Sequence, residues 1–273
     1  KGGDEPSDIA SFWGTSPTKL YFLAISMRRL FADFSPTLFI TRNGDSLSSQ
    51  LLNKNPALFS IWGTSDRNIY AVGIGETIFH YDGSRWQKMK GIEESASLHF
   101  WEVTNSLWGS SVNDLYIAAN AGLFNYKGKR WEKVSLSPGK YYSFHEVWGL
   151  NKDFIVALGK ESDSPKWKEP KNVIAYFNGG HWNYYYPKEH TTSIWGTDTQ
   201  HVVVAGENGM LLKFDGSKWV VDERAALTYT NHEGGQVKAD YIAVAGTGPN
   251  DFYLAGNFVY EKRKDSSQLP SEI

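Results

Sequence analysis

The chain has 273 residues, of which 41% are hydrophobic and 15% aromatic, enough apolar side chain to build a large buried core. Its formal net charge is −2, so it has no excess of positive charge for a nucleic-acid backbone, and nucleic acid is not an expected partner. It has no cysteine and no apolar run near the roughly 18 residues that span a bilayer, which argues against disulfides, thiolate chemistry and a membrane-crossing helix.

Residues 1–10 are predicted to form a flexible tether before a single folded domain of residues 11–273. The opening segment, KGGDEPSD, is polar, acidic and rich in glycine. It resembles the segment that follows the lipid-bearing cysteine in bacterial surface lipoproteins. That resemblance implies an exported protein, periplasmic or on the cell surface, whose only connection to the membrane is an N-terminal lipid anchor.

A Trp-Gly pair recurs along the chain every 40 to 49 residues. Polar residues follow each pair, and then comes a β-rich run such as residues 69–73, IYAVG, so each copy predicts two strands joined by a turn. The copies are Trp13-Gly14, Trp62-Gly63, Trp108-Gly109, Trp148-Gly149 and Trp195-Gly196.

A second marker lies between successive pairs and contains a glycine followed by a tryptophan. Glycine suits the positive φ of a tight hairpin turn, so this marker predicts a third and a fourth strand in each copy. It occurs as Asp82-Gly83-Ser84-Arg85-Trp86, Lys127-Gly128-Lys129-Arg130-Trp131, Asn178-Gly179-Gly180-His181-Trp182 and Asp215-Gly216-Ser217-Lys218-Trp219.

Two copies are longer than the others, and a sixth copy is hidden by substitution. The distance from the first Trp to the turn Gly is 20 or 21 residues in the second, third and fifth copies but 31 in the first and fourth, which predicts insertions at 27–36 and 159–171. In the first copy Leu47 replaces the turn tryptophan. In the sixth, Ala245-Gly246-Thr247 replaces Trp-Gly-Thr, and the turn spacing falls at 265–269.

Four short strands in each unit of 40 to 50 residues predict an all-β, six-bladed β-propeller with four antiparallel strands per blade. A blade cannot bury its apolar faces alone, so stacked blades form the core, and large aromatic side chains suit the junctions. The predicted blades are 11–57, 58–103, 104–143, 144–191, 192–240 and 241–273. The tryptophans assigned to packing are Trp13, Trp62, Trp108, Trp148 and Trp195 of the pairs and Trp86, Trp131, Trp182 and Trp219 of the turns.

The repeat resembles that of bacterial secreted and surface proteins whose units read W-G-[ST], then a strand, then [DN]-G-x-x-W. Its turn is also similar to a shortened Asp-box, the motif of sialidases and of the photosystem assembly factor propeller, where the box is structural. The resemblance covers all six units. It implies the fold and gives little information on function.

No enzyme motif is present in the sequence. It contains no H-E-x-x-H, P-loop, G-x-S-x-G or calcium loop, and no arginine triad of the kind sialidases use for the substrate carboxylate. No catalytic residue, metal or cofactor is assigned. The sequence therefore favours a binding module over an enzyme. The alternative is a carbohydrate-active enzyme, a glycoside hydrolase or lyase, with catalytic residues scattered over several blades.

The candidate ligand site lies in the connections between blades, which a propeller gathers on one face around its axis. Their aromatic and histidine side chains have two interpretations: residues that begin the next inner strand, or a rim that binds a protein or glycan. Trp167 is included because the insertion that carries it opens on the same face. Its side chain is expected to be partly exposed. The candidate ligand-binding residues are His99, Trp101, Tyr142, His145, Tyr186, His190 and Trp167.

The leading hypothesis is a non-catalytic binding or scaffold module of the bacterial envelope or cell surface, with a protein or glycan as its partner. A structural part of a larger envelope assembly is a further alternative. Convergent carboxylates with perturbed pKa values in a deep pocket would favour the enzyme, and an open aromatic platform would favour the module.

Overall fold

Antiparallel β-strands account for nearly all of the regular secondary structure in the part of the chain that the structure describes. The computed structural model describes residues 8–25, 37–52, 57–75, 77–90, 104–223, 227–230, 234–249 and 251–257. The chain divides into two compact units, Lys1–Pro170 and Lys171–Ile273. Over the described ranges, no helix is long and apolar enough to cross a membrane.

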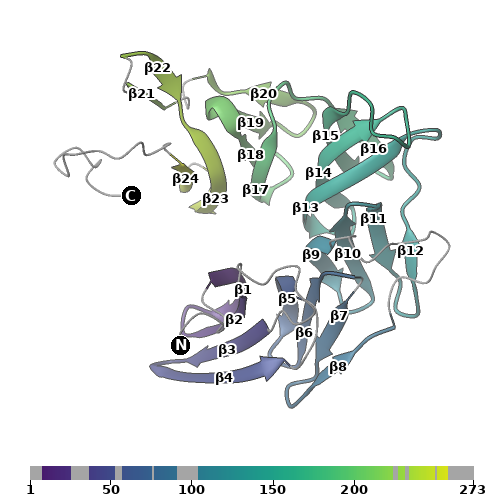
Figure 1. Ribbon diagram of the computed structural model, residues 1–273, viewed down its shortest axis with the longest axis vertical. Coiled ribbons are helices and arrows are strands. Elements are labelled where there is room, and N and C mark those ends of the chain that lie inside the picture. The colour runs from purple at the N-terminus through teal and green to yellow at the C-terminus, as the bar shows by residue number, and fades with distance from the viewer. Residues whose placement is uncertain are drawn as a thin grey trace. The chain divides into compact units, whose positions relative to one another are not determined.

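Sheets of four antiparallel strands follow one another in the described part of the first unit, each with its strands in sequence order (Figure 1). They are β1–β4, β5–β8 and β9–β12, and the long hairpin β13–β14 begins the fourth repeat. The strands are β1 (Asp8–Ser16), β2 (Lys19–Ile25), β3 (Thr37–Asn43), β4 (Ser46–Leu52), β5 (Leu58–Ser65), β6 (Asn68–Gly73), β7 (Ile78–Tyr81), β8 (Trp86–Lys88), β9 (Thr104–Ser111), β10 (Asp114–Ala119), β11 (Gly122–Tyr126), β12 (Trp131–Lys133), β13 (Tyr141–Asn151) and β14 (Phe154–Ser162).

The second unit continues the same pattern. It contains the hairpin β15–β16, the sheet β17–β20 and the hairpins β21–β22 and β23–β24. Its elements are β15 (Lys171–Asn178), β16 (His181–Tyr185), β17 (Thr191–Asp198), β18 (His201–Gly206), the short 3-10 helix η2 (Glu207–Gly209), β19 (Leu211–Phe214), β20 (Trp219–Val221), β21 (Thr228–Thr230), β22 (Gln236–Lys238), β23 (Asp240–Gly248) and β24 (Asp251–Asn257).

These sheets confirm the predicted β-propeller with antiparallel blades. The six repeats appear in order, with β13–β14 and β15–β16 as the two halves of the fourth and β23–β24 as the first half of the sixth. The turn predicted at 265–269 lies outside the described residues. The hairpin β21–β22, between the fifth and sixth repeats, was not expected from the repeat pattern.

The two predicted insertions have different outcomes. Residues 27–36 lie outside the described part of the chain. The second insertion is shorter than predicted, because Gly159–Ser162 belong to β14, where they pair with Tyr141–Phe144 of β13, and Lys171 begins β15. The connection that remains is 163–170. The extra length of this repeat is therefore divided between a longer hairpin and a shorter loop.

Contacts between a tryptophan and a glycine of the Trp-Gly pairs join neighbouring repeats at four junctions that the structure describes. The Trp108 ring of the third repeat lies over Gly149 of the fourth, where a Cβ atom would come within 2.7 Å of the ring carbon Cη2. Only glycine leaves room for the ring at this distance. The same contact joins Trp13 to Gly63, Trp62 to Gly109, and Trp195 to Gly246.

A serine two residues before the tryptophan makes a second, polar connection at the same junctions. Ser60 Oγ accepts a hydrogen bond from the backbone N–H of Leu107 in the next repeat, at 3.1 Å. This bond fixes the offset between adjacent inner strands, which share no β ladder. Ser11, Ser106 and Ser193 accept the equivalent bonds from Ile61, Val147 and Val244, at 3.3, 3.3 and 3.2 Å.

Three turn tryptophans pack outside the inner strands, each toward the repeat before it, whereas Trp182 packs on Phe177 of its own repeat. Trp86 meets Phe39 edge to face, with ring centroids 4.9 Å apart. Trp219 meets Tyr176 in the same way at 6.0 Å. Trp131 belongs to the buried cluster that combines side chains of the second and third repeats. One repeat therefore contributes aromatic rings to both of its junctions.

The Asp-Gly turns are stabilised by the aspartate side chains. Asp82 Oδ1 accepts hydrogen bonds from the N–H groups of Ser84 and Arg85, both at 2.9 Å, and from Ser84 Oγ at 2.7 Å. The bonds from Arg85 and Ser84 hold the pKa of the Asp82 carboxyl well below its usual range. Asp215 accepts the equivalent bonds in the fifth repeat, and its pKa is lowered for the same reason.

Acid should destabilise the protein partly through these two turns. Because both pKa values are lower in the folded chain, the stabilisation is complete above the unfolded aspartate pKa of about 4 and is lost as the pH falls through the folded values. Replacing Asp82 and Asp215 by asparagine, which accepts the same bonds without titrating, should flatten the fall in melting temperature between about pH 5 and pH 2. Thermal melts over this range test the prediction, and equal slopes for the two proteins would contradict it.

Candidate functional site

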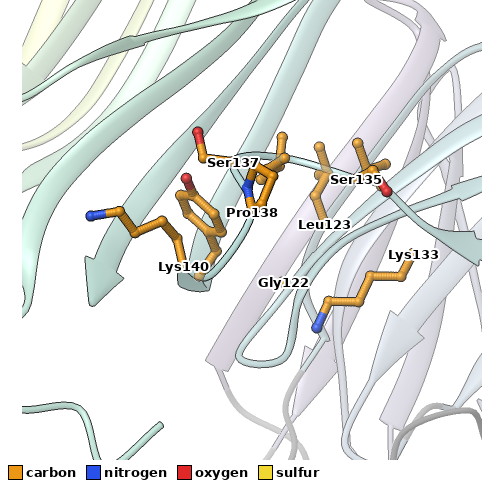
Figure 2. Close-up of a pocket in the computed structure, with 10 residues that line it drawn as sticks. Gly122, Leu123, Lys133, Ser135, Ser137, Pro138 and Lys140 are labelled. Carbon is orange, nitrogen blue, oxygen red and sulfur yellow. The ribbon is translucent and has the colours of Figure 1, made fainter. Parts of the chain in front are cut away.

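A pocket lies at the connection between the third and fourth repeats, on the face where successive blades are joined. Its volume is about 390 Å³, and the start of β11, the end of β12, the connection 134–140 and the start of β13 surround it. Figure 2 shows Leu123 and Pro138 in the middle of the lining and the amino groups of Lys133 and Lys140 at its edge. The lining residues are Gly122, Leu123, Lys133, Val134, Ser135, Leu136, Ser137, Pro138, Lys140 and Tyr142.

Local backbone contacts hold the pocket open. Val134 continues past β12 and donates its N–H to the carbonyl of Leu123, at 2.9 Å, which ties the connection to β11. Gly122 leaves room for the stem of Lys133, whose Cε would lie 3.0 Å from a Cβ atom there. The Lys133 ammonium group is 6.0 Å from the Phe124 ring centroid. The hairpin β11–β12 thus supplies Leu123 to the floor and Lys133 to the edge, and the connection 134–140 supplies the rest of the floor.

Lys140 links the pocket to the insertion of the fourth repeat. Its ammonium group forms ion pairs with Glu161, at 3.2 Å, and with Asp163. The hydrogen bonds that Lys140 donates to Asp163 and Glu161 raise the pKa of Lys140. Because two carboxylates already surround this cation, its charge is compensated within the protein. Its place at the edge is structural: it holds the base of the 163–170 connection.

The connection 163–170 is an ordered loop that carries Trp167. Ser162 Oγ donates to the Lys168 carbonyl at 3.2 Å, and the Trp167 N–H donates to the Ser164 carbonyl at 3.0 Å. Trp167 and Glu169 have φ values of 52° and 49°, a left-handed conformation that costs energy for residues other than glycine. The Trp167 side chain is half-buried, in line with the expected partial exposure.

Unpaired positive charge accumulates around this loop and the pocket. Lys166 and Lys168 flank Trp167, and Lys133 lies at the pocket edge; all three are exposed. Within the described part of the chain, none of these three ammonium groups has a carboxylate within ion-pair distance. The protein as a whole has a formal net charge of −2, and the same loop also carries the exposed Glu169 beside Lys168.

The other candidate residues of the first unit have mixed positions. Tyr142 lines the pocket but is only 8% exposed, and its ring stacks on Phe144 with centroids 5.7 Å apart. His145 is half-buried in β13, at an irregularity in the pairing with β14. His99 and Trp101 lie outside the described residues. Their proposed part in ligand binding stays a prediction.

In the second unit, Tyr186 is exposed and His190 lies directly before β17. The His190 carbonyl accepts the Glu207 N–H at 2.9 Å, and its Nδ1 atom lies 3.9 Å from a Glu207 carboxylate oxygen. Asn208 donates to Glu189 at 2.8 Å and thereby lowers the pKa of that carboxyl. The connection before β17 is thus fixed against η2 by main-chain and side-chain bonds. Binding by Tyr186 and His190 also stays a prediction.

The resolved pKa shifts of carboxyl groups have a common direction. Among the described residues, each aspartate and glutamate with a resolved shift has a lowered pKa, caused first by hydrogen bonds from backbone N–H groups or from polar side chains. The described residues also contain no group of three or more histidine, aspartate or glutamate side chains placed to hold a metal ion. The sequence did not predict the pocket because its lining, apart from Tyr142, carries no aromatic or histidine side chain and follows no repeated motif.

Neither a family model nor a curated protein sequence matches the chain. Its fold is similar to that of the WD40 repeats of RRP9, with a TM-score of 0.61 and 11% identity over 89% of this chain and 71% of that one. YCF48 from Cyanidioschyzon merolae gives a TM-score of 0.57 with 12% identity, over 92% of this chain and 93% of its own.

A third similar structure is the extracellular domain of a hybrid two-component system protein from B. thetaiotaomicron. Its TM-score is 0.53 with 10% identity, and the match covers 92% of this chain but 38% of that one. At 10–12% identity these likenesses show the β-propeller fold alone. The resemblance of the repeat to those of bacterial surface proteins stays a prediction.

Proposed function

We propose that this protein is a binding module that holds a partner protein on the face formed by the connections between its blades. The observation that carries the proposal is the pocket of about 390 Å³ between β11, β12 and β13, with an apolar floor and a lysine edge. Such a pocket can take one apolar side chain of a partner while the edge contacts polar groups around it. The similar WD40 and YCF48 structures support only the β-propeller fold of this module.

The chemistry of the lining favours a protein partner over a glycan. Sugar recognition commonly uses the exposed face of an aromatic ring, whereas the Tyr142 ring is buried and stacked on Phe144. Leu123, Leu136 and Pro138 offer aliphatic contacts instead. These contacts suit a leucine or phenylalanine side chain of a polypeptide.

The charge around the pocket favours an acidic segment of that partner. Lys133, Lys166 and Lys168 are exposed and have no carboxylate partner among the described residues, so they are available to aspartate or glutamate side chains. Trp167 supplies a half-exposed ring between two of them. The left-handed conformation of Trp167 is the kind of local strain that recurs at binding sites.

The alternative of a carbohydrate-active enzyme has less support. A glycoside hydrolase needs one carboxylic acid with a raised pKa beside a second carboxylate. The pocket lining has no aspartate or glutamate, and the nearby Glu161 and Asp163 are paired with Lys140. We also propose an exported location, supported by the acidic, glycine-rich N-terminal segment and its resemblance to surface lipoproteins.

Selection from a random 12-residue peptide library on the immobilised protein tests this function. We expect enriched peptides to carry one leucine or phenylalanine among aspartates and glutamates. Reversing the charge of Lys133 or Lys168 to glutamate should weaken their binding by about tenfold, as rim charges commonly do, with no change in melting temperature. Fluorescence anisotropy of the labelled peptide and thermal melts measure the two quantities.

A matched control is Lys129→Glu, an equally exposed lysine at the opposite end of the same hairpin. It should bind the selected peptides like the wild type. Leu136→Ser should weaken binding through the apolar floor. Peptides without acidic enrichment, or equal losses in Lys129→Glu and Lys133→Glu, would show that the partner is bound elsewhere.

A further inference from the structure

The outer strand of the first repeat differs from the other outer strands that the structure describes. β4 has seven residues, SLSSQLL, whereas β8, β12 and β20 have three and β16 has five. It contains no charged residue and no proline. Leu47 takes the position of the turn tryptophan of the other repeats. Short, charged or proline-containing edges are the usual protection of a sheet against pairing with another chain, and β4 has none of these protections.

β4 is a regular edge strand, and no strand of the described ranges pairs with its outer side. It is the last strand of its sheet, and it pairs with β3 over seven residue pairs without a bulge. Gly44 and Asp45 form the two-residue turn between them, with a φ of 60° at Gly44 and no positive φ at Asp45, as in a type II′ turn. No bulge therefore interrupts the edge along which a further strand could pair.

The turn also fixes which backbone groups point outward. A two-residue turn makes Asn43 and Ser46 a hydrogen-bonded pair, and such pairs recur at every second position of an antiparallel ladder. The N–H and C=O groups of Leu47, Ser49 and Leu51 consequently point away from β3. They form an open row of donors and acceptors on the outer edge of β4.

The side chains make this row complementary to itself. Leu47 and Leu51 lie on the same side of the strand, four residues apart, and are 71% and 48% exposed. If two β4 strands run antiparallel about an axis at Ser49, Leu47 of each copy faces Leu51 of the other. This register also brings the outward groups of residues 47, 49 and 51 into hydrogen-bonded pairs. The pairing of the outward backbone groups and the contact between the leucines therefore require the same register.

We propose that β4 pairs with β4 of a second copy of this protein, antiparallel and centred on Ser49, so that two first-repeat sheets become one sheet of eight strands. The partner is a second copy because one symmetric register pairs the outward N–H and C=O groups of both strands and also brings the exposed leucines of the two copies into contact. The proposal is independent of the proposed function. With the proposed function, such a dimer would carry two peptide-binding faces, and a partner with repeated acidic segments would then bind more tightly where it can reach both.

Engineered cysteines test the register directly, because the natural chain has none. In a hydrogen-bonded antiparallel pair the facing Cα atoms are about 5.5 Å apart, within the span of a disulfide. Ser49→Cys should therefore form a covalent dimer under mild oxidation. Ser46→Cys, equally exposed on the same strand, would lie about 20 Å from its counterpart and should not. Equal cross-linking of both variants would indicate random collision and overturn the proposal.

Analytical ultracentrifugation of the unmodified chain completes the test. We expect a reversible dimer, and Ser49→Pro should raise its dissociation constant by about tenfold or more, because proline removes an outward N–H that β3 does not use. Leu47→Lys should act similarly without touching the backbone, while Val220→Lys at an exposed apolar position of another outer strand, β20, should have no effect. A wild-type chain that is monomeric up to about 0.5 mM, or variants that dimerise as it does, would overturn the proposal.

Discussion

Replacing Trp131 by alanine is expected to lower the free energy of unfolding by about 3–5 kcal/mol, the usual cost of truncating a large aromatic residue in a core. The ring is 6% exposed and belongs to the cluster that joins the second and third repeats. It also packs on Tyr126, with ring centroids 5.2 Å apart. Denaturant unfolding followed by circular dichroism measures the change.

Two neighbouring variants make this result specific. Trp131→Phe keeps a ring in the cluster and should lose clearly less stability than alanine. Arg130→Ala removes an exposed side chain whose partner is the adjacent Glu132, and it should cost less than about 1 kcal/mol. A small loss for Trp131→Ala, close to that of Arg130→Ala, would mean that the junction between these repeats does not depend on the turn tryptophan.

Replacing Gly149 by alanine is expected to lower the free energy of unfolding by about 1–3 kcal/mol, the range for overpacking a core. The three atoms nearest to the new Cβ are all in the Trp108 ring, at 2.7 to 2.8 Å. The ring is buried between repeats, so it can move only by displacing its neighbours. Thermal and denaturant unfolding both report the change.

A double-mutant cycle separates this contact from other effects of alanine on the strand. In a Trp108→Leu background the smaller side chain leaves space, so adding Gly149→Ala should cost clearly less than in the wild type. The difference between the two costs is the coupling of Gly149 to Trp108. Costs that are simply additive would show that the glycine is required for the strand itself.

The fold could be predicted because its signals occur in several copies. One Trp-Gly pair is uninformative, but five pairs at similar spacing, with a turn marker between them, predict repeated antiparallel sheets whatever the loops do. The sequence contains a serine two positions before four of the tryptophans, but it did not predict the hydrogen bonds that these serines accept. The serines are Ser11, Ser60, Ser106 and Ser193. A serine two positions before a tryptophan predicts no hydrogen bond by itself, because its donor is a backbone N–H group of the next repeat, and the sequence does not show which one lies opposite.

The candidate site was harder to predict, because it depends on what differs among the repeats. Tyr142 was expected on an open rim, yet β13 begins at Tyr141, and strand alternation then turns Tyr141 outward and Tyr142 inward. A shift of one residue in the strand start would exchange the two. The pocket floor came from residues 134–140, which carry no aromatic or histidine and so gave no signal.

The junctions between repeats have a direction. The ring and the hydroxyl oxygen come from the earlier repeat, and the glycine and the N–H group come from the later one. During synthesis from the N-terminus, each new repeat therefore meets a neighbour whose half of the contact already exists, which favours folding one blade at a time. In the sixth repeat Ala243 and Ala245 replace the serine and the tryptophan. This repeat therefore supplies the glycine and the N–H group to its junction with the fifth repeat, but it has neither the ring nor the hydroxyl group for a further junction of this kind.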